Sequence, residues 1–205
     1  MRIDRPPPGE GLNEGEPTTP RLAASVILLR EAAGGGEPEV LLVKRNPAAR
    51  FMGGVWVFPG GAVGETDDGP EAAALRELDE EAGIALGATA ELVPFARWIT
   101  PAEVRVRFDT WFYLAASPAG AEARVDGEEC VEAAWLSAAD ALDAGRHERL
   151  HLVFPTIKQL EQLTETPSVE AALDRARATE VTPILPRVLV DADEARVVLP
   201  GEPGY

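Results

Sequence analysis

The segment from Glu71 to Ala82 has both the composition and the boundaries of a helix. Alanine, leucine, arginine and glutamate fill most of it, Pro70 precedes it and Gly83 follows it directly. Proline suits the first turn of a helix and glycine commonly ends one. We therefore predict a helix over this segment, and the fold of the chain must pack one side of it.

The two faces of this predicted helix differ in charge. On a helical wheel, its apolar side chains gather on one side; they are Leu75, Leu78 and Ala82. Three carboxylates gather well away from them; they are Glu77, Glu80 and Glu81. Such an arrangement is also typical of an ordinary solvated helix face, so the neighbouring sequence must decide. Carboxylates at this spacing repel one another by roughly a few tenths of a kcal/mol per pair, and a hard cation with oxygen ligands would compensate.

The sequence around these carboxylates resembles a known motif. Residues 76–84 read R-E-L-D-E-E-A-G-I. They match the second half of the Nudix box, R-E-U-x-E-E-x-G-U with U an aliphatic residue, at every defined position. Gly60 and Gly61 stand upstream, after a predicted strand, where that box begins. The chain therefore resembles the Nudix hydrolases, from Leu22 to about Gly145.

The first half of the box departs from its commonest spacing, G-x5-E-x7-R. Counting back from Arg76 places the expected glutamate at Asp68 and the expected glycine at Ala62, so the loop after Gly61 has gained one residue. Three acids can replace the missing glutamate, although each also suits a turn or a helix cap. The candidates are Glu65, Asp67 and Asp68.

The resemblance implies a role for the residues of the helix. In the family, the final pair of carboxylates, here Glu80 and Glu81, binds divalent metal ions with help from the preceding glutamate, here Glu77. The arginine of the motif, here Arg76, orients these carboxylates through a salt bridge. The implied cofactor is Mg²⁺ or Mn²⁺.

A further catalytic or metal-binding glutamate of the family often comes from a loop before the last strand of the sheet. Glu128 and Glu129 are the candidates, and we favour Glu129. The implied reaction is metal-dependent hydrolysis of a phosphoanhydride bond in a nucleoside diphosphate linked to another group, with a glutamate taking the proton from water. The catalytic residues that we expect are Arg76, Glu77, Glu80 and Glu129.

The sequence upstream of the helix bears on the substrate. It matches much of the longer signature of the coenzyme A diphosphatase branch, including its peroxisomal relatives. The matching positions are Leu41, Leu42, Arg50, Gly54 and 58–61, and the departing ones are Val43, Arg45 and Asn46. We expect Arg50, Gly60 and Gly61 to bind substrate. Coenzyme A or its esters come first, with an ADP-sugar or a dinucleotide as the alternative.

A different class of function is a Nudix-fold module that binds such a ligand without cleaving it. Degenerate modules usually lose acids from the motif R-E-U-x-E-E, and residues 76–81 retain all of them. The enzyme is therefore favoured over the binding module.

The order of the predicted elements indicates an α+β fold. Strands are predicted at 22–29 and 40–44, which form a hairpin, and at 55–58, 105–115 and 131–136. Further helices are predicted at 138–145, capped by Ser137, and at 151–162 and 169–179. A terminal hairpin is predicted from 187–190 and 195–199. The resemblance implies an α/β/α sandwich with a mixed sheet and a catalytic loop-helix-loop.

Composition limits the classes of partner. The formal net charge of −16, from 35 acidic and 19 basic residues, argues against a broad electrostatic contact with nucleic acid and favours a small-molecule substrate. No stretch approaches the ~20 apolar residues of a membrane-spanning helix, and the polar start is unlike a signal peptide, so we expect a cytoplasmic protein. One cysteine and two histidines exclude a Cys/His zinc site.

The domain organisation that we expect is simple. Residues 1–20 are rich in proline and glycine and read as a flexible arm. Residues 21–205 read as a single domain with a C-terminal helical extension and hairpin. Members of the family often dimerise, which makes a homodimer a further expectation.

Overall fold

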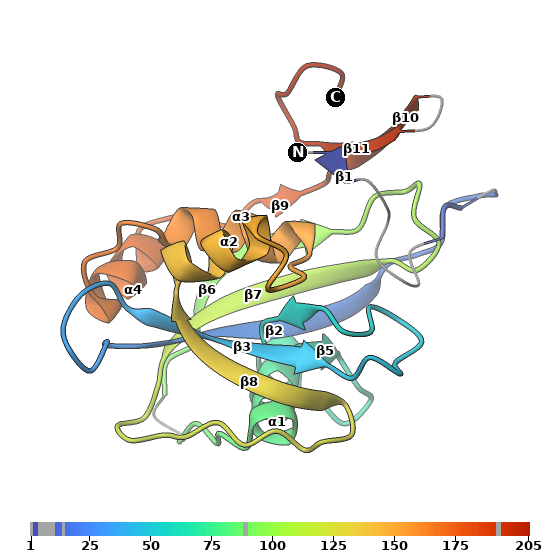
Figure 1. The fold of residues 1–205 in the computed structure, drawn as a ribbon. Helices are drawn as coiled ribbons and strands as arrows, with labels where there is room; N and C mark the ends of the chain where they lie inside the picture. The colour runs from blue at the N-terminus through green and yellow to red at the C-terminus, as the bar shows by residue number, and fades with distance from the viewer. Residues whose placement is uncertain (1, 4–10, 14, 88–89, 192–193) are drawn as a thin grey trace.

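A mixed sheet runs through the middle of the molecule and separates two hydrophobic layers (Figure 1). The computed structural model describes residues 2–3, 11–13, 15–87, 90–191 and 194–205. The strands of the main sheet are β2 (Arg21–Arg30), β3 (Glu39–Arg45), β4 (Trp56–Val57), β5 (Gly60–Ala62), β6 (Val93–Ile99), β7 (Phe108–Ala116), β8 (Cys130–Ser137) and β9 (Pro183–Ile184). Their order is β4-β3-β2-β7-β6-β9, with β5 also paired to β2 and β8 to β3.

Strand β2 is the centre of this sheet. It forms the predicted antiparallel hairpin with β3 and runs parallel to β7 from Arg21 to Leu29. It also pairs with the short strand β5, where Ser25 lies opposite Gly60 and Ala24 opposite Gly61. This pairing places the two glycines of the motif directly on the sheet.

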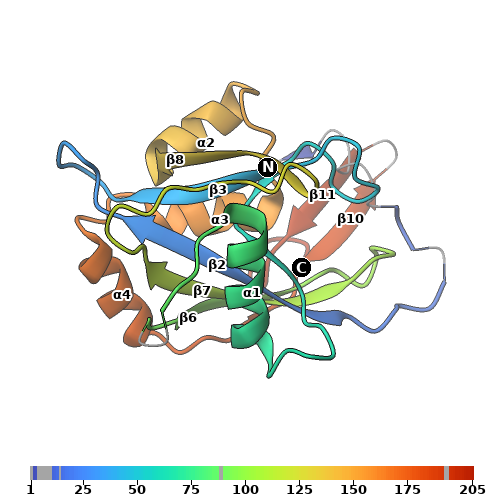
Figure 2. The ribbon, with the colours of Figure 1, turned by 90° about the horizontal axis from the view of Figure 1, so that it is seen from below.

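The side chains of β2 alternate between the two layers, as expected for a strand buried on both faces. One face packs against α1 (Pro70–Ala82), and the other packs against α2 (Ala138–Arg146), α3 (Phe154–Leu163) and α4 (Val169–Arg177). Figure 2 shows α1 lying across its face of the sheet. The α/β/α sandwich expected from the sequence is confirmed.

The boundaries of the helices follow from local sequence. Helix α1 has Pro70 in its first turn and ends at Gly83, whose φ of 63° is left-handed, as predicted. The hydroxyl of Ser137 accepts a hydrogen bond from Asp140 N–H at 3.0 Å, which confirms the predicted cap of α2. Helix α3 begins at Phe154, later than predicted, because Pro155 suits a first turn and not an interior position.

Two other boundaries differ from the prediction. Strand β7 begins at Phe108 and not at Arg105, because the N–H of Arg105 is bonded to the carbonyl of Gly11. Strand β6 is not among the predicted strands, because Pro94 and a register shift between Pro94 and Ala96 interrupt its alternation. Among the residues that the structure describes, none of the helices has both the length and the apolar character needed to span a bilayer.

The two ends of the chain meet in a second, smaller sheet. The predicted terminal hairpin is present as β10 (Arg187–Asp191) and β11 (Glu194–Val198), and β1 (Arg2–Ile3) pairs with β11 (Figure 1). The predicted arm also contacts the body at Leu12, which forms a β-bridge with Val104. Residues 1, 4–10 and 14 lie outside the described residues. The flexibility of the arm stays a prediction there, whereas its described residues have more local structure than their composition indicates.

We expect Ser137→Ala to lower the free energy of unfolding by about 1 kcal/mol, the usual worth of a helix cap. Its hydroxyl holds the Asp140 N–H, and it also donates to the Asp140 carboxylate at 2.8 Å. The measurement is urea denaturation followed by circular dichroism. Ser117→Ala is the control, because the Ser117 hydroxyl donates to the neighbouring Pro118 carbonyl at 3.3 Å and caps no helix. Equal losses in the two variants would contradict the capping role.

Candidate active site

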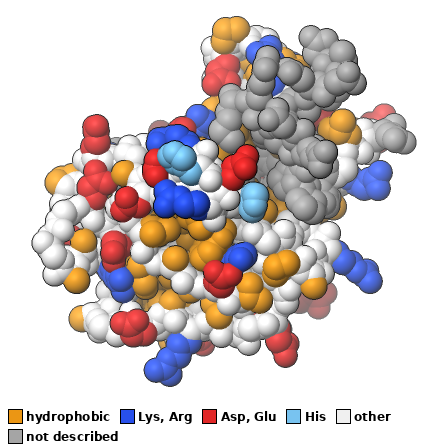
Figure 3. Space-filling model, in the orientation of Figure 1, with side chains coloured by type: hydrophobic (Ala, Val, Ile, Leu, Met, Phe, Trp, Pro, Cys, Tyr) orange, Lys and Arg blue, Asp and Glu red, His pale blue; other side chains and the backbone are white. Residues whose placement is uncertain are grey.

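A cavity of about 1530 Å³ lies beside the N-terminal halves of strands β2 and β7. The segments before α1 and α3 also line it. Apolar and aromatic side chains form much of its wall, among them Phe51, Phe58, Trp98, Phe108 and Phe154. In Figure 3, hydrophobic side chains gather on the face that also carries the histidines. The polar part of the wall includes Glu77 and Glu129.

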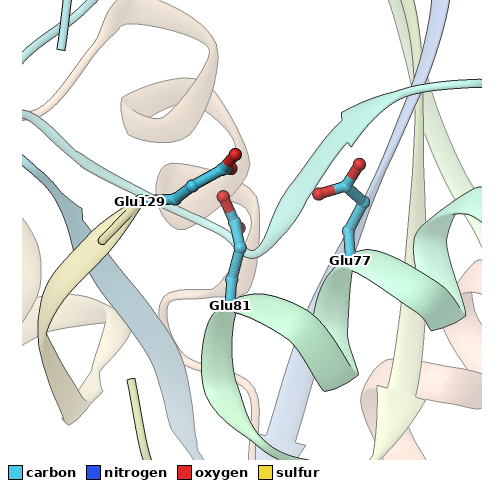
Figure 4. A group of neighbouring side chains, drawn as sticks. All are labelled: Glu77, Glu81 and Glu129. Atoms are coloured by element: carbon cyan, nitrogen blue, oxygen red, sulfur yellow. The ribbon is translucent and has the colours of Figure 1, made fainter. Parts of the chain in front are cut away.

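Three carboxylates meet at this part of the cavity (Figure 4). Glu77 and Glu81 come from consecutive turns of α1, and Glu129 comes from the loop before β8. One oxygen of each lies within 4.8 Å of those of the other two. Of the two candidates in that loop, it is Glu129 and not Glu128 that joins the group. The arrangement offers an all-oxygen ligand set to a cation.

Glu81 is the most deeply buried of the three, with 1% of the residue exposed. Gly60 N–H donates to its Oε2 at 2.9 Å, and Arg45 Nη1 lies 3.8 Å from its Oε1. Burial raises the pKa of Glu81 to about 7, against the opposing effects of the Gly60 hydrogen bond and the Arg45 charge. Within the described residues, Oε1 has no hydrogen-bond partner. A buried carboxylate oxygen of this kind is suited to bind a cation.

Glu77 is also buried, with 9% of the residue exposed. Burial raises its pKa, and the hydrogen bond from Arg76 Nη1 to its Oε1, at 2.8 Å, acts in the opposite direction. The arginine thus opposes the protonation that burial favours, and a carboxylate must be ionised to bind a metal ion.

Arg76 connects the helix to the preceding loop. Its Nε and Nη2 donate to the two oxygens of Asp67, at 3.0 and 2.8 Å, in a bidentate pair. This hydrogen bonding lowers the pKa of Asp67 to about 2. Of the three acids left open from the sequence, Asp67 makes these contacts, whereas Glu65 and Asp68 are exposed.

The place of the extra residue follows from this contact. Asp67 stands six positions after Gly61, the spacing of glycine and glutamate in the common motif, so the insertion lies between Asp67 and Arg76. Counting forward from the glycine, instead of back from the arginine, would have found Asp67.

Glu80 is placed differently from the other acids of the helix. Its side chain is 59% exposed and accepts a hydrogen bond from Arg76 Nη1 at 2.8 Å. It lies outside the group of three. Its role as a metal ligand therefore stays a prediction. To bind the ion, the Glu80 carboxylate would have to give up its hydrogen bond from Arg76.

The predicted substrate-binding residues divide into two sets. Gly60 and Gly61 line the cavity, whereas Arg50 is exposed and is not part of the lining. A side chain on Gly60 would overlap Ser25 and the carbonyl of Ala24. One on Gly61 would overlap the Glu77 carboxylate. These close approaches explain why glycine stands at both positions.

Comparison with known proteins agrees with the fold and the motif. The family model described as the NUDIX domain matches residues 19–157, which is more than half of the chain. The chain therefore belongs to the NUDIX domain family.

Individual relatives are moderately similar. The chain is 28% identical to a protein named "Putative nudix hydrolase 7" of Caenorhabditis elegans over 183 residues, which cover 71% of this chain and 61% of the relative. It is 33% identical to "Putative 8-oxo-dGTP diphosphatase 3" of Mycobacterium tuberculosis over 130 residues, which cover 62% of this chain and 57% of the relative. The matches thus span only about three fifths of these relatives. A crystal structure of a NUDIX hydrolase from Alicyclobacillus acidocaldarius superimposes with a TM-score of 0.68 at 28% identity, covering 77% of this chain and 96% of that one.

We expect Gly61→Ala to displace the Glu77 carboxylate and to weaken the binding of Mn²⁺ at least about tenfold, because the added methyl group overlaps the carboxylate. Calorimetric titration with Mn²⁺ and a thermal melt measure both effects. Gly34→Ala is the matched control, since a methyl group there meets open space. If Gly61→Ala binds Mn²⁺ as tightly as Gly34→Ala, the close approach has no role in the site.

Proposed function

We propose that this chain is a metal-dependent hydrolase that cleaves a phosphoanhydride bond in a nucleoside diphosphate linked to another group. The observation that carries the proposal is the meeting of Glu77, Glu81 and Glu129 within 4.8 Å, with Glu77 and Glu129 in the wall of a large cavity. Membership of the NUDIX domain family supports it.

The ligand set fits Mg²⁺ or Mn²⁺. Both ions prefer oxygen ligands, and Oε1 of buried Glu81, which has no hydrogen-bond partner among the described residues, provides such an oxygen. Glu77 and Glu81 would hold the ion, with Glu80 as a further proposed ligand. When bound, the ion neutralises phosphate oxygens and lowers the pKa of a water molecule.

The remaining chemistry belongs to side chains and backbone groups of this chain. Glu129 is exposed at the cavity, so its carboxylate can take the proton from the attacking water. Arg76 holds Glu77 and Glu80 in place, and Gly60 N–H holds Glu81. Cys130 is unsuited to act as a nucleophile, because it is fully buried and burial raises the pKa of its thiol.

We further propose coenzyme A or its esters as the first substrates to test, with an ADP-sugar or a dinucleotide as the alternative. The partial signature in residues 41–61 supports this order. The apolar wall of the cavity can accommodate the part of such a substrate that lies beyond the diphosphate. A cytoplasmic location and a homodimer stay predictions from the sequence.

The test of the function is incubation of the purified protein with Mg²⁺ and coenzyme A, ADP-ribose, NADH or diadenosine polyphosphates, with products identified by mass. Cleavage of the diphosphate linkage in at least one of them is expected, together with its loss on chelation and its recovery with Mg²⁺ or Mn²⁺. Tight binding without any product would instead support the non-catalytic binding module.

We expect Glu81→Gln to lower kcat/KM by roughly a hundredfold or more at moderate metal concentration, because several kcal/mol of stabilisation depend on a bound ion. Glu80→Gln should have a smaller effect, since Glu80 is exposed and paired with Arg76. Steady-state kinetics over a range of Mg²⁺ concentrations measure both. Asp79→Asn, an exposed acid on the same helix, is the matched control. A near-normal rate for Glu81→Gln at saturating metal would contradict the site.

We expect Arg50→Ala to lower kcat/KM for coenzyme A by roughly ten- to hundredfold, the worth of one charged hydrogen bond to phosphate. Arg50 directly precedes 51–54, which line the cavity, and its side chain is exposed. The same variant is assayed on ADP-ribose and by thermal melting. A loss confined to coenzyme A at an unchanged melting point supports phosphate binding, whereas equal losses with a lowered melting point would identify a loop anchor.

A further inference from the structure

Glu129 lies on an exposed loop, yet its carboxylate is held beside two buried ones. The main chain of Glu129 is fixed from two sides. Its N–H donates to Asp126 Oδ2 at 2.8 Å, and its carbonyl accepts from Asn46 N–H at 2.8 Å. Asp126 Oδ1 also accepts from Cys130 N–H at 2.9 Å. Asp126 acts from within the same loop, whereas Asn46 acts from another segment of the chain.

The side chain of Asn46 adds a second contact with the loop. Its Nδ2 donates to the carbonyl of Glu128 at 2.8 Å, while its Oδ1 accepts from Ala48 N–H at 2.9 Å. The amide group thus connects the loop that carries Glu129 to the turn that begins at Asn46. Residues 51–54 of the same segment line the cavity.

These contacts begin where the regular sheet ends. Strands β3 and β8 pair in register as far as Lys44 and Glu132, and the next pair is Arg45 with Cys130, so Val131 is an extra residue in β8. A bulge of this kind redirects the chain that follows it. Asn46 directly follows β3, and the hydrogen bond from its backbone N–H to the Glu129 carbonyl continues the contact between the two segments beyond the bulge.

We propose that Asn46 is a positioning residue for Glu129. Through its hydrogen bonds to the backbone of residues 128 and 129, it keeps the Glu129 carboxylate beside those of Glu77 and Glu81. The proposal rests on the hydrolase function proposed above. Asn46 is also one of the positions at which the chain departs from the coenzyme A signature. This departure therefore has a structural role independent of substrate recognition.

The kinetic test is a double-mutant cycle. Asn46→Ala should lower kcat roughly tenfold or more with little change in KM, because a small displacement of a general base removes much of its contribution. In a Glu129→Gln background, the same substitution should change kcat less than about twofold, because Asn46 acts through Glu129. Equal losses in both backgrounds would overturn the proposal.

A second test does not depend on turnover. We expect Asn46→Ala to increase the amide exchange rates of Glu129 and Cys130 by roughly tenfold, measured by NMR on the full chain. Asn46→Asp should do the same, because it retains a side-chain acceptor for Ala48 N–H but has no side-chain N–H to donate to the Glu128 carbonyl. Rescue by Asn46→Asp would show that Asn46 merely stabilises its own turn, and would overturn the proposal.

The matched control is Asn13→Ala. Asn13 makes the same two kinds of hydrogen bond, to the Glu16 carbonyl and from Gly15 N–H, at 2.9 and 3.2 Å, in a local turn. Exchange at Glu129 and kcat should be unchanged in this variant. If the wild type cleaves no diphosphate, the proposed function fails, and the exchange rates still decide whether Asn46 holds the loop. Unchanged exchange in Asn46→Ala would overturn the proposal whatever the activity.

Discussion

The repulsion among three neighbouring carboxylates is the constraint around which the site is built. At an effective dielectric constant of about 20, two such charges within the 4.8 Å of Glu77 and Glu81 repel by roughly 3 kcal/mol. The surrounding groups offset this repulsion only in part. Arg76 donates a hydrogen bond to Glu77, Gly60 N–H donates one to Glu81, and Arg45 Nη1 lies 3.8 Å from Glu81 Oε1. Burial is the main cause that raises the pKa of Glu81 to about 7, and the neighbouring charge of Glu77 raises it further. A bound divalent cation would provide the charge that the protein itself does not supply.

Much of the helix that carries these acids could be predicted, because its determinants are local. Pro70 and Gly83 define its ends through backbone conformation alone, and the structure confirms both. Ser137 caps α2 for an equally local reason. The hairpin of β2 and β3 also connects neighbouring segments, so the apolar runs and the glycines between them were sufficient to predict it.

The remaining features depend on contacts between distant segments. A helical wheel places Glu80 and Glu81 close together, whereas contacts with distant segments, among them Gly60 on β5 and Arg45, surround Glu81 and leave Glu80 exposed. The partner of Arg76 could not be chosen from spacing, because an insertion can be placed on either side of Asp67. The hydrogen bond from Asn46 N–H to the Glu129 carbonyl likewise joins residues far apart in the sequence, so no local pattern could predict it.

The parallel pairing of β2 with β7 has a consequence for the way in which the chain is made. The strand that begins the domain cannot complete its hydrogen bonds until the chain has been synthesised as far as Ala116, and α1 lies between the two. Closing so long a loop slows folding. A nascent chain that already contains the whole motif still presents β2 as an unpaired apolar edge, which favours aggregation. Helix α1 packs mainly against β2 and β5, which precede it in the chain, but the apolar cluster beneath it is complete only once β7 and the start of β8 have been synthesised.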